Sequence, residues 1–122
     1  VVITNTTGVT LTGATQAVFK DPAVTGLAVN TVTCSGAECP CASCNVAAMQ
    51  GAGITIPSLT NNSSVTFTIN ATVSATPPAT FTNTATVTVG AATASASDTN
   101  GGSGSGAGGS KVRVIKWREV FQ

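Results

Sequence analysis

The 122-residue chain contains no histidine and no tyrosine, and only 7% of its residues are charged. Histidine is the side chain that most often moves protons near neutral pH and is a common metal ligand. Without it, catalysis would depend on lysines and four carboxylates, and no spacing among these carboxylates indicates an acid/base pair: Asp21, Glu38, Asp98 and Glu119. Five Lys and Arg residues are few for a nucleic-acid surface. We therefore expect no enzymatic activity, cofactor, metal, nucleic acid or small-molecule substrate.

Long apolar runs and helical periods are also missing. No apolar run approaches the roughly 20 residues that a membrane-spanning helix needs, and no stretch has a convincing helical period. The mean hydropathy of +0.34 excludes a wholly disordered chain. The length suits one domain with a small β core.

Charge divides the chain into unequal parts. Residues 1–100 carry one cation and three carboxylates, a net charge of −2, whereas residues 111–122 carry four cations and one carboxylate, a net charge of +3. Between them, residues 101–110 read GGSGSGAGGS, a composition typical of a flexible and engineered linker that reaches at most about 33 Å. We expect a body (1–100), a linker (101–110) and a separate strand (111–122).

Two-residue alternation predicts strands in the body. The clearest runs are Val65–Val73 and Phe81–Val89, where apolar residues alternate mainly with threonine. Weaker signals cover 1–5, 14–19 and 27–33, and turn residues separate the runs: Pro57-Ser58, Asn61-Asn62, Pro77-Pro78 and Gly90. Short strands with frequent turns favour an antiparallel β-sandwich.

Several motifs resemble a known bacterial surface repeat. They are VITNT with Gly8, LTG at 11–13, the KDP step at 20–22, Gly26-Leu27, Thr33-Cys34, Ile56-Pro57, SVTFT at 64–68 and FTNTATV at 81–87. In order and spacing they resemble the immunoglobulin-like repeat called domain of unknown function eleven, over about residues 1–99. The resemblance implies an extracellular β-sandwich that builds surface proteins or filaments and has no enzymatic activity of its own.

The resemblance also indicates a missing strand. Such repeats begin with an additional strand and enter the VTNT strand through several alternating residues, whereas Val1 already lies inside that strand. The last twelve residues, KVRVIKWREVFQ, can supply it, because Gln122 placed before Val1 gives REVFQVVITNT, which resembles the usual run. Their alternation changes phase near Ile115, as a bulge allows. Six apolar residues are the candidate donor-strand positions: Val112, Val114, Ile115, Trp117, Val120 and Phe121.

We expect the tail to be the native N-terminal segment, moved to the C-terminus so that the molecule fills its own groove. In a filament built by donor-strand complementation, a neighbour fills that groove by β-augmentation. Burying four large apolar side chains is worth about 6–12 kcal/mol gross, comparable to the stability of a small domain. The alternatives are a simple circular permutant of a surface repeat and a foreign peptide tethered for binding studies.

Four cysteines lie within eleven residues: Cys34, Cys39, Cys41 and Cys44. The C-x4-C-x-C-x2-C spacing differs from paired zinc knuckles and from ferredoxin patterns, and a secreted β domain favours disulfides. A Cys39–Cys41 bridge would be strained, which leaves Cys34–Cys39 with Cys41–Cys44, or Cys34–Cys41 with Cys39–Cys44. The family often carries a pair resembling Cys34 and Cys39, so the resemblance favours the first pairing.

We therefore expect a structural subunit of a bacterial extracellular filament or pilus, whose partners are neighbouring copies in a head-to-tail polymer. The alternative is one immunoglobulin-like repeat of a large adhesin, which would contact a host or neighbouring cell.

Overall fold

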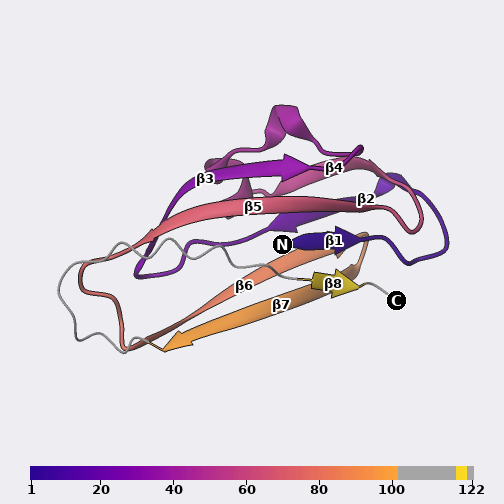
Figure 1. Ribbon diagram of the computed structural model, residues 1–122. Coiled ribbons are helices and arrows are strands. Elements are labelled where there is room, and N and C mark those ends of the chain that lie inside the picture. The colour runs from indigo at the N-terminus through magenta and orange to yellow at the C-terminus, as the bar shows by residue number, and fades with distance from the viewer. Residues whose placement is uncertain (102–117, 121–122) are drawn as a thin grey trace.

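The computed structural model describes residues 1–101 and 118–120, which form two packed four-stranded sheets (Figure 1). The order is β3-β5-β1-β8 in the first sheet and β4-β2-β6-β7 in the second. Neighbouring strands are antiparallel, except that β8 runs parallel to β1. The strands are β1 (Val2–Thr4), β2 (Leu11–Lys20), β3 (Leu27–Ser35), β4 (Ile54–Leu59), β5 (Ser64–Val73), β6 (Thr80–Val89), β7 (Ala92–Gly101) and β8 (Arg118–Val120). The predicted all-β sandwich, the class of the immunoglobulin-like fold, is confirmed.

The core lies between the inner faces of the sheets, where alternation along each strand directs every second side chain. Val65 and Phe67 of β5 are 0% and 1% exposed, and the Phe67 ring stacks on Phe19 of β2 with 4.4 Å between centroids. Aromatic stacking adds about 0.5–1.5 kcal/mol to the burial of these rings. The remaining buried apolar residues are Val1, Ile3, Leu11, Ala17, Val32, Met49, Ile54, Ile56, Leu59, Ala85 and Val87.

The β6–β7 hairpin is regular over its whole length, from Thr80 opposite Gly101 to Val89 opposite Ala92. Gly90 has a φ of 57° in the tight connection, where a positive φ suits the twist of a hairpin. Cross-strand hydroxyl pairs cover its outer face: Thr82–Thr99 at 2.9 Å, Thr84–Ser97 at 2.8 Å and Thr88–Thr93 at 3.3 Å. The alternation did not predict β7, because its inward positions carry alanine and Asp98 rather than large apolar residues. β7 also includes Gly101, the first residue of the predicted linker.

Two local predictions were wrong. Pro57-Ser58 lies within β4 rather than at a turn. β4 is an edge strand, and the register of β2 against β4 shifts between Thr12 and Ala17, so that Pro57 falls where no ladder partner is needed. The chain also forms a five-residue helix, α1 (Val46–Gln50), which is too short to show a helical period. Asn45 caps α1 by accepting a hydrogen bond from the Ala48 N–H at 2.8 Å.

Asn5 anchors the turns that follow β1 and β4. Its side chain is 1% exposed and uses both of its polar atoms. The amide nitrogen donates to the carbonyl oxygens of Val9 and Leu59, at 2.7 Å each, and Oδ1 accepts from the Thr7 N–H at 3.0 Å and the Thr7 hydroxyl at 2.7 Å. A buried amide with every bond satisfied fixes the chain around it.

Candidate functional site

Within the part of the chain that the structure describes, one edge of β5 is paired over only part of its length. β3 pairs with β5 from Thr66 to Val73, whereas β1 pairs with it from Ser64 to Thr66. The last bonds on the β1 side join Phe67 and Val1, N–H to carbonyl in both directions at 2.8 Å. Beyond Phe67, no strand of the described residues lies on this side. Because alternate residues direct their backbone groups to opposite edges, Ile69 and Ala71 present N–H and C=O groups there.

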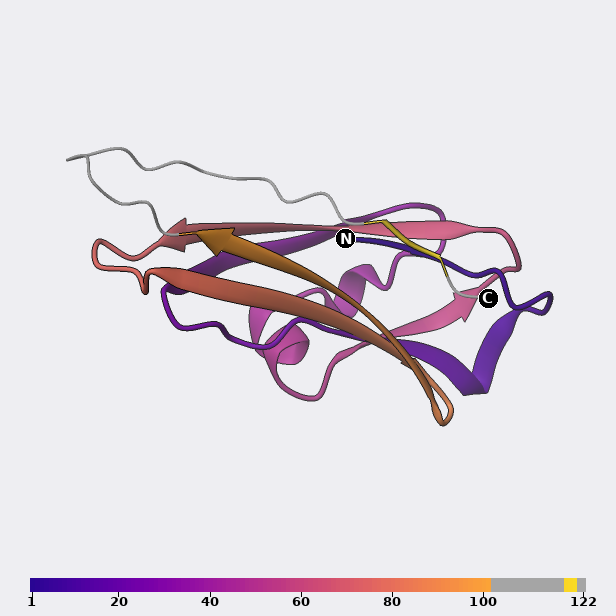
Figure 2. The ribbon, with the colours of Figure 1, turned by 90° about the horizontal axis from the view of Figure 1, so that it is seen from below.

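The core becomes progressively less covered along the same stretch. Val65 and Phe67 are fully buried, Ile69 and Ala71 are half-buried, and Val73 is 41% exposed. Figure 2 shows the cause, because β1 begins about midway along β5, and no other described strand lies beside the far half of β5 on that side. An unpaired edge beside a half-covered apolar face is the arrangement that accepts an added strand.

The opposite sheet contributes to this half-covered end. Phe81, at the start of β6, is half-buried and shares the inner face of its sheet with buried Ala85 and Val87. Figure 2 shows the end of β5, the beginning of β6 and the end of β7 together at this end of the sandwich. β7 therefore ends at Gly101, opposite Thr80, beside this half-covered stretch. We call the β5 edge from Thr68 to Val73, together with Phe81, the acceptor edge.

Three residues of the tail lie against the body. Arg118, Glu119 and Val120 form β8, which pairs in parallel with β1 from Val2 to Thr4. Among the candidate donor residues, only Val120 falls in this strand, and its backbone alone is described. Val112, Val114, Ile115, Trp117 and Phe121 lie outside the described residues. Completion of the sandwich by the whole tail therefore stays a prediction.

A buried carboxylate lies beneath β6. Asp21 is 3% exposed, and its Oδ2 accepts a hydrogen bond from the Asn83 amide at 3.2 Å. Burial raises the pKa of this carboxyl, while the Asn83 bond and the nearby Val1 ammonium oppose the rise. In the sequence, Asp21 stands out only as part of the KDP step, since nothing local shows that its side chain points inward. Asp98 of β7 stands opposite Asn83 on the same inner face and is half-buried.

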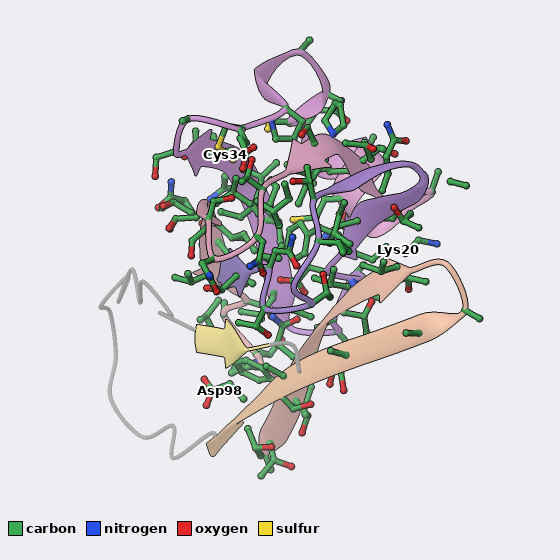
Figure 3. All side chains as sticks on the ribbon, turned by 90° about the vertical axis from the view of Figure 1, so that its right-hand side faces the viewer. Lys20, Cys34 and Asp98 are labelled. Atoms are coloured by element: carbon green, nitrogen blue, oxygen red, sulfur yellow. A yellow bond between two sulfur atoms is a disulfide. The ribbon has the colours of Figure 1, made fainter. Side chains whose placement is uncertain are left out.

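The cysteine segment stiffens a loop away from the acceptor edge. Cys34 and Cys39 form a disulfide with a Cα–Cα distance of 5.8 Å, the pair that the family resemblance favoured. Figure 3 shows Cys34 on the far side of the molecule from Asp98 and β8. Cys44 Sγ lies 3.4 Å from the Pro40 carbonyl oxygen, and Cys41 opens a short 3-10 helix, Cys41–Ser43. The Cys41 side chain lies outside the described part, so its bridge to Cys44 stays a prediction.

Glu38 joins the disulfide loop to the turn between β4 and β5. Its carboxylate accepts from the Thr60 N–H at 2.9 and 3.0 Å, from the Thr60 hydroxyl at 2.6 Å and from the Ser63 hydroxyl. The Ser63 and Thr60 bonds hold the pKa of Glu38 below its ordinary value. No local pattern indicates this contact, because Glu38 and Thr60 are 22 positions apart.

Within residues 1–101 and 118–120 there is no cluster of three or more side chains suited to hold a metal ion. No helix in the same described part is long and apolar enough to cross a bilayer. Searches of family models, curated proteins and solved structures return no match to this chain.

Proposed function

We propose that this protein is a structural subunit of a bacterial extracellular filament or pilus, and that each subunit is completed by a strand from its neighbour. In the present chain the subunit's own tail takes that place, which gives a monomer. The observation that carries the proposal is the acceptor edge, where β5 continues for six residues past Phe67 with β3 on one side and no described strand on the β1 side.

Unpaired edges favour uncontrolled association, and sandwiches normally shorten, charge or cover them. The acceptor edge carries Ile69, Ala71 and Val73 on its inner face and has no charged residue between Thr68 and Val73. A permanent partner strand explains why such an edge is tolerated. Strand donation from one copy to the next is a heterologous contact that does not close, so it produces a linear polymer.

Further support comes from the tail and the disulfide. The tail has strand-forming apolar residues, follows a Gly/Ser linker, and carries +3 against −2 on the body. The Cys34–Cys39 disulfide suits an oxidising, extracellular setting. The proposed role is mechanical and needs no catalytic group or cofactor.

A rearranged chain with residues 111–122 placed directly before Val1 and no linker tests the proposal. It should form head-to-tail multimers, visible by electron microscopy and by sedimentation, while the present chain stays monomeric. Trp117→Asp in the rearranged chain should prevent multimers, because it places a charge at a core-facing donor position. The matched change Lys116→Asp, on the opposite face, should leave them intact. Strictly monomeric behaviour at high concentration would favour the adhesin-repeat alternative.

A further inference from the structure

Among the described residues, no strand continues the line of β1 along β5 beyond Val1. β1 occupies the row next to β5 only as far as Val1, and β8 lies in the following row, parallel to β1 and therefore antiparallel to β5. The chain that enters β8 comes from residues 111–117, which directly precede Arg118 in the sequence. Continued upstream from Arg118, a strand in this direction runs from the level of Val73 towards that of Phe67. To lie directly beside β5 it must move over by one strand position before Arg118, because β8 lies on the far side of β1.

The lengths of the two segments agree. The edge from Thr68 to Val73 spans about 20 Å, and residues 111–117 span about 23 Å as a strand, at roughly 3.3 Å per residue. The body also ends at Gly101, at the same end of the sandwich as Val73. Residues 102–110 thus have only a short path to cover before the segment begins.

The chemistry of the two surfaces is complementary. Residues 111–117 read KVRVIKW, in which Val112 and Val114 alternate with cations and Trp117 is the single tryptophan of the chain. The acceptor edge offers half-buried apolar side chains to one face of such a strand. Residues 1–100 carry a net charge of −2 against +3 on residues 111–122, so a cationic strand is favoured over an acidic one.

We propose that residues 111–117 of the same chain pair antiparallel with the acceptor edge, in line with β1, and cover Ile69, Ala71 and Phe81. The tail then has two parts. Residues 111–117 lie beside β5 in line with β1, and β8 lies beside β1 itself. This placement rests on the proposed function in taking the tail as the completing strand. The placement goes further in naming the part of the tail, residues 111–117, that pairs with the acceptor edge.

Amide hydrogen exchange of the unaltered chain, resolved by NMR, tests the placement. The N–H groups of Ile69 and Ala71 point away from β3, towards the position in line with β1, whereas the Thr68 N–H points towards β3. We expect Ile69 and Ala71 to exchange at least tenfold more slowly than an unstructured peptide, at every protein concentration. Exchange at the unstructured rate would overturn the placement. Protection that disappears on dilution would also overturn it, by assigning the row to a second copy.

A pair of proline variants identifies the occupant. Val114→Pro, which removes a ladder N–H from the tail, should accelerate exchange at Ile69 and Ala71 at least tenfold while Thr68 stays slow. Ala107→Pro, in the linker, should leave all three unchanged. Unchanged protection of Ile69 and Ala71 in the Val114→Pro chain would overturn the assignment.

Trp117 fluorescence supplies a second measurement that needs no variant. Quenching by acrylamide should be much weaker than for free tryptophan, and quenching equal to free tryptophan would contradict the placement. Both measurements are made on the monomer. Their failure is therefore distinct from a failure of the rearranged chain to polymerise.

Discussion

Asn5→Asp is a sharp test of how the body is held together. The substitution keeps the shape of the side chain but replaces an NH2 group that donates to Val9 and Leu59, at 2.7 Å each, by an oxygen. Two carbonyl oxygens then face an acceptor in a site that is 1% exposed. Each unsatisfied buried group costs about 1–3 kcal/mol, so we expect a loss of about 2–6 kcal/mol.

Urea denaturation of the parent and variant at pH 7 measures this loss, provided that the slope with denaturant is unchanged. Asn61→Asp is the matched control. The Asn61 side chain accepts from the Gly8 N–H at 2.9 Å in an exposed position, and an aspartate retains that acceptor. We expect the control to change the free energy of unfolding by less than about 0.5 kcal/mol.

The pH dependence of the Asn5→Asp variant adds a second constraint. Burial should raise the pKa of the new carboxyl, and its protonated form regains one donor. The difference from the parent should therefore shrink as the pH falls through the raised pKa, and it should be smallest below about 4, the ordinary aspartate pKa. An Asn5→Asp variant within about 0.5 kcal/mol of the parent at pH 7 would refute the role assigned to this amide.

Three further predictions concern the carboxylates and the disulfide. Glu38→Gln should lower the melting temperature at neutral pH. This difference should disappear as the pH falls through the lowered pKa of Glu38, because the carboxylate stabilises the fold only while it is ionised. A difference in melting temperature that stays constant with pH would contradict this. Asp21→Asn should gain stability relative to the parent as the pH rises from the ordinary aspartate pKa through the raised value, since burial penalises the ionised form; parallel melting curves against pH would argue against it. Replacing Cys34 and Cys39 together by alanine should lower the free energy of unfolding, measured in urea, by about 2 kcal/mol from loop entropy alone. An unchanged free energy of unfolding would show that the disulfide does not stabilise the fold.

The strand pattern was readable from the sequence where large apolar residues alternate with threonine. β5 and β6 follow the predicted runs within one residue at each end, and β1, β2 and β3 overlap the weaker signals. β4 and β7 were missed for different physical reasons. Pro57 indicated a turn but sits in an edge strand at a register shift, and β7 is paired by backbone bonds and by small residues that carry no alternation signal.

The candidate site was predictable only in outline. The sequence indicated that the sandwich needs another strand. Where that strand would pair depends on how far β1 extends along β5, and this is set by the register between β1 and β5. The inward orientation of Asp21 and the contact of Glu38 with Thr60 likewise depend on residues distant in the sequence. Local patterns contain no information on such contacts.

The central claim is that the body is incomplete without the tail. A chain ending at Gly101, melted in urea with and without a synthetic peptide of residues 111–122, tests it most directly. We predict that the shortened chain is several kcal/mol less stable than the parent, and that the peptide restores stability in proportion to its concentration while a scrambled peptide of equal charge does not. A shortened chain as stable as the parent and indifferent to the peptide would contradict the account.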